Sequence, residues 1–232
     1  VVSGSPESKV YLFKDMPEIE HVLTASDRVR VREERLKNQK KDNPEKGEIA
    51  FQFLTPRITD FDSLTVFAVE AFMPYYHTET RTSYGYYGYY GGYPYTYTVF
   101  DGYDFFSEVL LAFDRDGHLK WQQSVKFENE LTYDLFPHGS EGVCFDELVV
   151  ASPYRNNLRY TAFDAEGQVL MSQQNEKLAP IHGADYVEDE YFAQMAKWYG
   201  NRFLIYGSQI IQNSTQPKPR RTVFYLQKVQ YD

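Results

Sequence analysis

The sequence is short of residues that several common classes of site require. It has a single cysteine, Cys144, in 232 residues, so an internal disulfide and a cysteine-built zinc site are both excluded. No apolar run approaches the roughly 18 residues that a membrane-spanning helix needs, and we expect no membrane span. Positive charge is also scarce, because 24 Lys and Arg stand against 33 Asp and Glu, a net charge of −9. A nucleic-acid-binding protein needs the opposite balance, so we expect no nucleic-acid partner.

Motifs for nucleotide binding and for nucleophilic catalysis are missing as well. The glycines of residues 84–97 are followed neither by Lys-Ser/Thr nor by a helical pattern, so they do not predict a phosphate-binding loop. Residues 138–142, His-Gly-Ser-Glu-Gly, lack the first glycine of Gly-x-Ser-x-Gly and run into a strand pattern in place of a helix. Cys144 lies within that strand pattern and is expected to be an inert core thiol. We therefore expect no cofactor and favour a protein that is not an enzyme.

What the chain has is apolar and aromatic content, arranged in a repeat. Hydrophobic residues make up 42%, enough for a core, and 21 Tyr and 17 Phe are present. The segment Ala-Phe-Asp-x-x-Gly occurs at residues 112–117 and again, 50 residues later, at residues 162–167. Each copy predicts a strand, a tight turn at Asp-x-x-Gly and a returning strand.

Further strand patterns complete this unit. They begin at the turn residues Asp62, Asp146 and Asn201, and the last of them is expected to pair with a closing strand over residues 221–229. Short strands that recur roughly every 40–50 residues are typical of β-propeller blades. Three to four blades are visible, which is few for a closed ring. We therefore predict an all-β, propeller-like chain that is part of a larger propeller or is completed by a partner.

The predicted organisation has three parts. Residues 1–24, which include a strand pattern at residues 9–14, are a partial first blade. Residues 25–48 are a charged loop insertion, because they are too polar to bury a face. Residues 49–232 hold the propeller-like blades, interrupted by a Tyr/Gly-rich loop at residues 84–97.

Five segments also carry a resemblance to known proteins. They are residues 68–80, 99–103, 112–121, 198–207 and 221–226. These segments resemble a set of uncharacterised propeller-like proteins of Bacteroidota, and the resemblance covers most of residues 49–232. Its specific parts are Glu-Ala-Phe…Pro-Tyr and Val-Phe-Asp-Gly-Tyr. The resemblance implies a β-rich fold and a cell-envelope or exported setting, and it supplies no activity and no catalytic residue.

The Tyr/Gly-rich segment is the most unusual feature and the predicted binding surface. It contains eight tyrosines, four glycines and one proline. Tyrosine offers a flat apolar face and a hydroxyl at modest conformational cost, and the glycines let the backbone bend so that several rings point one way. The alternative is that the rings pack on one another and on the blade beneath. The predicted binding residues are Tyr75, Tyr76, Tyr84, Tyr86, Tyr87, Tyr89, Tyr90, Tyr93, Tyr95, Tyr97 and Tyr103.

Charged residues flank the tyrosine segment. Glu70, His77, Glu79 and Asp101 could form an acid/base or metal-binding set. Strand alternation places Glu70 on the apolar side, where a carboxylate needs a partner, and Arg81 is the predicted partner. A structural ion pair is favoured over catalysis, and whether Glu70, His77 and Glu79 form one site is left open.

Two short motifs resemble a metal site and a glycosylation site, but each has a simpler interpretation. Asp114, Asp116 and His118 match the opening of a calcium loop, but the chain continues directly into a strand pattern. We therefore predict a hairpin turn and no metal. Asn213-Ser214-Thr215 matches a glycosylation acceptor, a triplet that is common by chance.

The sequence favours a non-catalytic binding or scaffold protein of a bacterial cell envelope. Its expected partner is a protein or a larger assembly, contacted through residues 75–103. One alternative is a carbohydrate-binding or carbohydrate-active module that uses the tyrosines as a platform. Another is an assembly subunit whose open sheet edges pair with neighbouring chains.

Overall fold

The computed structural model describes residues 52–83, 93–154, 157–178, 184–213, 215 and 219–232. The partial blade and charged loop predicted for residues 1–48 lie outside these ranges, as do Tyr84, Tyr86, Tyr87, Tyr89 and Tyr90. All the regular structure within these ranges is β-strand, arranged as three separate antiparallel sheets. The all-β prediction is therefore confirmed. Within the same ranges, no helix has the length and apolar character needed to cross a membrane.

The first sheet, sheet A, is built around two very long strands. Its members are β1 (Gln52–Phe53), β2 (Arg57–Phe61), β3 (Leu64–Ser83), β4 (Tyr93–Phe113) and β5 (Leu119–Thr132). The short strands β1 and β2 both pair with β3, on the edge opposite β4, and β5 pairs with the far edge of β4. Sheet A thus has four strand positions in chain order, the first of them shared by β1 and β2.

The other two sheets are also meanders in chain order. Sheet B holds β6 (Ser140–Cys144), β7 (Glu147–Tyr154), β8 (Asn157–Phe163) and β9 (Val169–Lys177). Sheet C holds β10 (Tyr186–Lys197), β11 (Arg202–Gln212) and β12 (Arg220–Gln230). The predicted pairing of the strand after Asn201 with the closing strand is confirmed as β11 with β12.

The two Asp-x-x-Gly segments form the predicted turns. Gly117 donates its backbone N–H to the Asp114 carbonyl at 3.0 Å, and Gly167 does the same to Asp164 at 3.0 Å. Both glycines have left-handed backbone angles, with φ of +74° and +77°, a conformation that costs other residues energy. These turns join β4 to β5 and β8 to β9, the third and fourth strand positions of sheets A and B.

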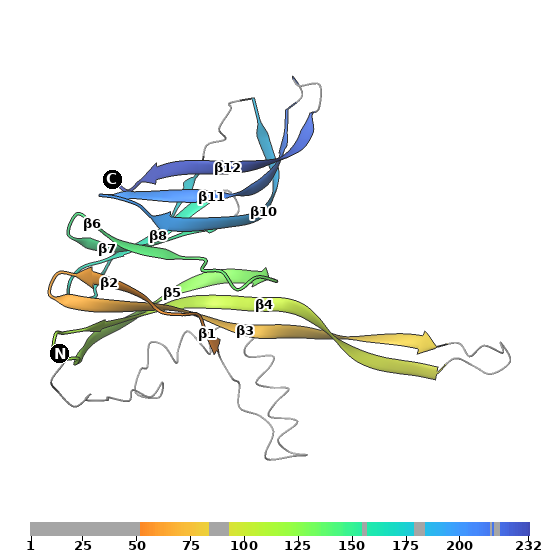
Figure 1. Cartoon of the computed structure of the whole chain (residues 1–232), viewed down its shortest axis with the longest axis horizontal. Helices are drawn as coiled ribbons and strands as arrows, with labels where there is room; N and C mark the ends of the chain where they lie inside the picture. The colour runs from red at the N-terminus through yellow and green to blue at the C-terminus, as the bar shows by residue number, and fades with distance from the viewer. Residues whose placement is uncertain (1–51, 84–92, 155–156, 179–183, 214, 216–218) are drawn as a thin grey trace, which may run out of the picture.

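The three sheets lie as layers, with sheet B in the middle (Figure 1). Apolar side chains that alternate along the strands fill the two interfaces. The interface between sheets A and B buries Val66, Leu110 and Leu148. The interface between sheets B and C buries Val149, Phe203 and Ile205. Each such side chain contributes about 1.5–3 kcal/mol to folding, so the layers stabilise one another.

Sheet A extends beyond this stack as a two-stranded hairpin (Figure 1). The pairing of β5 with β4 ends at Thr132 opposite Tyr103. Beyond it, residues 75–83 of β3 pair only with residues 93–102 of β4 among the described strands. We call these two segments the arm, which at about 3.3 Å per residue is roughly 30 Å long. Because β4 begins at Tyr93, the last part of the predicted loop at residues 84–97 is strand.

Candidate functional site

The arm presents two chemically different faces. Residues opposite one another in an antiparallel pair lie on the same face, and alternate residues lie on opposite faces. Pairing of Thr78 with Thr98 and of Thr80 with Thr96 makes one surface, the threonine face. Pairing of Glu79 with Tyr97 and of Arg81 with Tyr95 makes the other, which also carries His77 and which we call the charged face.

A hydrogen-bonded chain of side chains runs along the charged face. His77 Nδ1 lies 2.6 Å from Asp101 Oδ1, and His77 Nε2 lies 3.3 Å from Glu79 Oε1. Glu79 also accepts hydrogen bonds from the Tyr97 hydroxyl and, at 3.3 Å, from Arg81 Nη2. The Arg81 guanidinium lies 5.1 Å from the centre of the Tyr97 ring. His77, Glu79 and Asp101, which the sequence placed near the tyrosines, are therefore brought together.

These contacts fix the charge of the face. Hydrogen bonds to Asp101 and then to Glu79 raise the pKa of His77. Hydrogen bonds from Tyr97 and from His77 lower the pKa of the Glu79 carboxyl. Basic and acidic side chains thus alternate along this face over a short span.

The predicted tyrosines divide into exposed and packed groups. Tyr76 and Tyr95 expose 46% and 50% of their surface, and Tyr75 is also exposed. The Tyr95 and Tyr97 rings stack with centroids 6.0 Å apart and an interplanar angle of 29°. Tyr103, in contrast, packs edge-on against Phe72 and Phe100 near the base of the arm. Binding and packing were alternatives in the sequence; Tyr103 is packed, and Tyr75, Tyr76 and Tyr95 are exposed.

Glu70 is fully buried, as its place in the strand pattern predicted. Its predicted partner is different, because Arg81 bonds Glu79 and the guanidinium at Glu70 belongs to Arg57 of β2. Arg57 Nη1 lies 3.1 Å from Glu70, and Nη2 lies 3.0 Å from Glu108. Arg57 Nε completes the cluster at 2.8 Å from Glu141. One guanidinium therefore joins three carboxylates from β3, β4 and β6.

Glu70 also holds the segment that leads into sheet B. Its carboxylate accepts backbone hydrogen bonds from His138 at 2.8 Å and from Gly139 at 2.9 Å. His138 Nδ1 lies 3.3 Å from Glu70 Oε2, and the His138 ring lies 4.2 Å from the Phe105 ring. The sequence pattern around His138 was dismissed as a catalytic motif, and its structural role is to anchor sheet B on sheet A.

The cluster holds more acid than its one guanidinium balances. Burial opposes the charge of Arg57, but the three carboxylates outweigh it and raise the arginine pKa. Burial likewise opposes ionisation of Glu70, yet hydrogen bonding to His138 and the charge of Arg57 lower its pKa. For Glu108 burial wins, and its pKa lies well above the ordinary value. Glu108 Oε2 has no hydrogen-bond partner among the described residues, and an unpaired negative charge at this buried atom would be costly.

A pocket borders this cluster at His138. The residues that line it are Thr132, Asp134, Phe136, Pro137, His138, Ala193 and Gln194. The lining has one carboxylate and no serine, cysteine or lysine, so it offers neither a nucleophile of those types nor two opposed carboxyl groups for glycoside hydrolysis. Together with the ion pairs of Glu70, this composition fits the predicted structural role better than catalysis.

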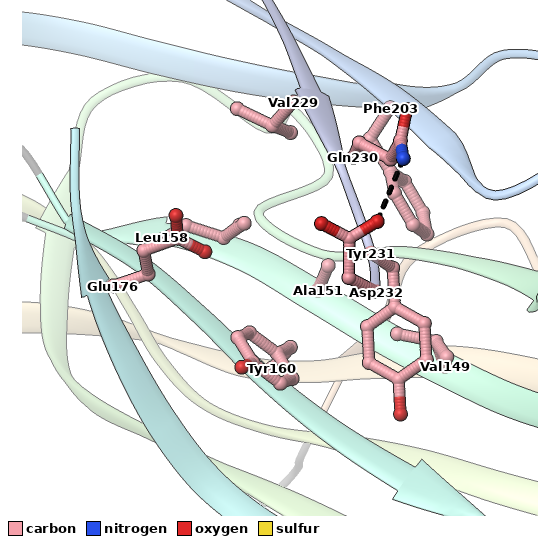
Figure 2. A pocket seen from close by; sticks show the side chains of 10 residues that line it. All are labelled: Val149, Ala151, Leu158, Tyr160, Glu176, Phe203, Val229, Gln230, Tyr231 and Asp232. Carbon is pink, nitrogen blue, oxygen red and sulfur yellow. Dashed lines mark hydrogen bonds between the residues drawn. The ribbon is translucent and has the colours of Figure 1, made fainter. Parts of the chain in front are cut away.

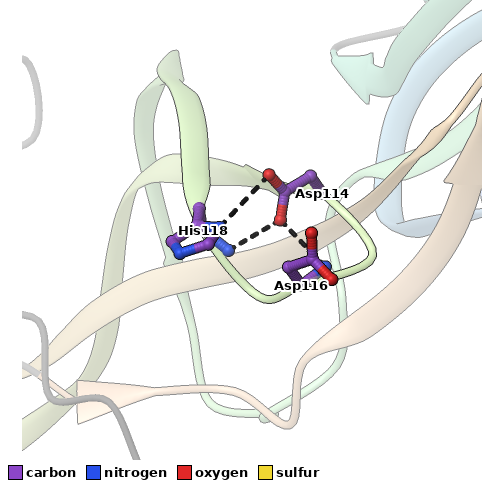
Figure 3. Close-up of side chains that lie close together, drawn as sticks. All are labelled: Asp114, Asp116 and His118. Atoms are coloured by element: carbon purple, nitrogen blue, oxygen red, sulfur yellow. Dashed lines mark hydrogen bonds and ion pairs between the residues drawn. The ribbon is translucent and has the colours of Figure 1, made fainter.

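The two short motifs also occupy structural positions. Asp114 Oδ1 accepts the backbone N–H groups of Asp116 at 3.0 Å and His118 at 2.9 Å, inside the hairpin turn (Figure 3). Its other oxygen lies 3.4 Å from His118 Nδ1 and 3.4 Å from Lys120 Nζ. The predicted turn therefore accounts for this acidic cluster.

The glycosylation triplet is likewise engaged in local structure. The Asn213 side chain is buried, and its Nδ2 donates to Asp185 Oδ1 at 2.6 Å. Its Oδ1 accepts the backbone N–H and the hydroxyl of Thr215, at 3.0 Å and 2.6 Å. In this conformation the amide nitrogen faces a carboxylate rather than solvent.

Comparison of the chain with protein-family models, with curated protein sequences and with solved structures found no match.

Proposed function

We propose that this protein is a non-catalytic binding or scaffold protein that contacts a protein partner through the charged face of the arm. The main support is the arm itself. Two-stranded hairpins are marginally stable in water without further packing, and the described part of the arm projects with both faces uncovered by another sheet. A hairpin of this length that does not contribute to the core is best explained by a role in recognition.

The chemistry of the charged face supports the same proposal. Exposed tyrosine beside arginine is typical of the residues that dominate protein–protein binding energy. Here Tyr95 and Arg81 lie opposite one another, and Tyr97 and Glu79 hold them in a defined arrangement. These side chains are therefore partly ordered before binding, which lowers the entropy cost of forming a complex.

We further propose that the three sheets are blades of a propeller-type fold in a bacterial envelope protein. Three meanders in chain order, packed face to face, with the same Asp-x-x-Gly turn in sheets A and B, support the fold. The envelope setting is what the resemblance of the sequence to propeller-like proteins of Bacteroidota implies.

A comparison of the two faces of the arm tests the binding proposal. The full tagged chain is expressed in its native cells as wild type, as Arg81→Ala/Tyr95→Ala and as Thr80→Ala/Thr96→Ala, and co-purifying proteins are quantified by mass spectrometry. We expect the charged-face variant to lose a stoichiometric partner and the threonine-face variant to keep it. Equal recovery from both variants, with unchanged circular dichroism, would contradict the proposal.

A carbohydrate is the second candidate ligand, favoured by one observation. The stacked rings of Tyr95 and Tyr97 form an aromatic platform, and the carboxylates of Glu79 and Asp101 lie on the same network as hydrogen-bond acceptors. An oligosaccharide array probed with wild type and with Tyr95→Ala tests whether the ligand is a carbohydrate rather than a protein. If wild type binds a glycan and Tyr95→Ala does not, the ligand of the charged face is a carbohydrate and not a protein.

A further inference from the structure

Sheet C has one strand fewer than its neighbours. Sheets A and B each have four strand positions in chain order, whereas sheet C ends at β12. Among the described strands β12 pairs only with β11, over all eleven residues from Arg220 to Gln230. The other edge of β12, over residues 221–230, pairs with no described strand and offers a regular row of backbone donors and acceptors.

A pocket lies between sheets B and C next to this edge. Its apolar lining comes from Val149, Ala151, Leu158, Phe203 and Val229, and its polar lining comes from Tyr160, Glu176, Gln230, Tyr231 and Asp232. Figure 2 shows Glu176 on one side of the pocket and Asp232 on the other. Glu176 belongs to β9, the fourth strand of sheet B.

The charge of the pocket has one sign. Its two acidic side chains are Glu176 and Asp232, and no lysine, arginine or histidine lines it. Burial, together with the hydrogen bond that Tyr231 donates to Glu147, raises the pKa of the Tyr231 hydroxyl, which keeps it neutral. Gln230 donates to Asp232 Oδ1 at 2.6 Å, and this bond orients one of the two carboxylates (Figure 2).

We propose that β12 is a docking edge for an extended peptide segment that carries a lysine or arginine. The segment adds antiparallel to β12 as a fourth strand of sheet C. Its backbone bonds to the free edge, and its basic side chain enters the pocket, where the aliphatic stem contacts Val229 and Leu158 and the cation lies between Glu176 and Asp232. This site is separate from the arm, and it does not depend on the function proposed for the arm.

A labelled peptide with a central lysine in an alternating Thr/Val sequence is the probe. Its binding to the full chain is followed by fluorescence anisotropy, beside the same peptide with glutamate at the centre and the same lysine peptide with alternate backbone nitrogens methylated. Strand addition predicts that the lysine peptide binds and that both controls fail. Equal binding of the methylated peptide would overturn strand addition, and equal binding of the glutamate peptide would overturn the role of the pocket.

Variants of the protein test the two carboxylates. Glu176→Gln/Asp232→Asn is expected to weaken lysine-peptide binding about fivefold, which corresponds to the upper range for partly exposed charge pairs. The matched control is Glu166→Gln, an exposed carboxylate on the turn between β8 and β9, which should leave the affinity unchanged. Equal affinity of all three proteins would contradict the assignment.

Hydrogen exchange separates the peptide from other occupants of the edge. We expect the β12 amides that point away from β11 to exchange fast in the free monomer and slowly with the lysine peptide, whereas the β12 amides that bond to β11 are protected in both states. Protection of the outward-pointing β12 amides in the free monomer would mean that the chain covers this edge itself and would overturn the proposal. If protection of β12 appears only when the molecular mass doubles, a second copy of the chain covers the edge. That result would also overturn the proposal.

Discussion

At the scale of single residues, the Arg57 side chain connects sheet A to sheet B through ion pairs. It bonds Glu70, Glu108 and Glu141 at 2.8–3.1 Å, and it thereby ties three strands of two sheets to one point. Buried ion pairs add little net stability when formed, but their disruption is costly because a charge is left without compensation.

Replacement of this guanidinium should therefore be severe. Arg57→Met is expected to lower the free energy of unfolding by about 3–5 kcal/mol, because the carboxylates lose their only guanidinium. The control is Arg220→Met, which removes an ion pair to Glu188 between exposed side chains and should cost less than about 1 kcal/mol. Urea unfolding of both variants measures the difference. Similar losses would show that the Arg57 cluster is not a stabilising junction.

The pH dependence of stability tests the state of Glu108. Its pKa is raised in the folded chain by burial, so between the ordinary value near 4.5 and the raised value the folded state holds a proton that the unfolded state has lost. Stability from this group is complete below the unfolded pKa and declines as pH rises through that window. Glu108→Gln removes the titration, so its stability relative to wild type should increase with pH by up to about 1.4 kcal/mol per pH unit.

Urea unfolding of wild type and Glu108→Gln between pH 5 and 8 provides the measurement. Glu70 titrates in both proteins, so its opposite contribution largely cancels in the difference. A difference that is flat across this range would mean that Glu108 is ionised in the folded chain.

At the scale of elements, the two Asp-x-x-Gly turns have the same backbone and different surroundings. A Cβ at Gly117 would meet nothing within 4 Å, whereas a Cβ at Gly167 would lie 2.6 Å from two atoms of the Trp121 ring. Trp121 is held in place, because its Nε1 donates to the Ala165 carbonyl at 2.9 Å. The turn of sheet B therefore packs against a strand of sheet A.

Alanine at these two glycines separates backbone strain from packing. Gly117→Ala should cost about 1 kcal/mol, the usual price of a left-handed angle for a residue with a side chain. Gly167→Ala should cost about 1–3 kcal/mol more, since the Trp121 ring has to move. Thermal or urea unfolding gives both values. Equal costs would indicate that Trp121 does not rest against this turn.

Much of the element structure could be predicted from the sequence, and the failures have local causes. Period-2 alternation placed Glu70 on the buried face, and the repeated turn chemistry gave the hairpins. The partner of Glu70 could not be predicted from the sequence. Arg57 reaches Glu70 because β2 pairs with β3, and a single sequence does not reveal that pairing. Arg81 was too far, since eleven residues along one extended strand span roughly 36 Å.

The arm shows a second limit of sequence interpretation. Glycine and proline made residues 84–97 resemble a loop throughout, yet Tyr93–Tyr97 belong to β4. Tyrosine and threonine favour strands, and this preference prevails here because residues 93–97 pair with residues 79–83 of β3. The cross-strand network of the charged face could not be foreseen without that register.

At the scale of the whole molecule, the chain combines a stack of sheets with two uncovered features. Sheets A and B share one apolar interface and sheets B and C share another, so both faces of sheet B are packed against another sheet. No described residue of the arm belongs to either interface, whereas β12 contributes Tyr225 and Val229 to the second one and leaves its outer edge unpaired among the described strands. The account therefore assigns stability to the stack and recognition to the features that extend from it.

The most direct measurement is site-specific photo-crosslinking of the full chain in its native cells. A photoreactive phenylalanine analogue replaces Tyr95 on the charged face, Thr80 on the threonine face, or Phe224, which is 66% exposed on β12. The account predicts that position 95 captures one defined protein, that position 80 does not, and that this protein is absent from position 224. Capture of the same protein with equal yield at all three positions, or no capture at position 95, would contradict recognition by the arm.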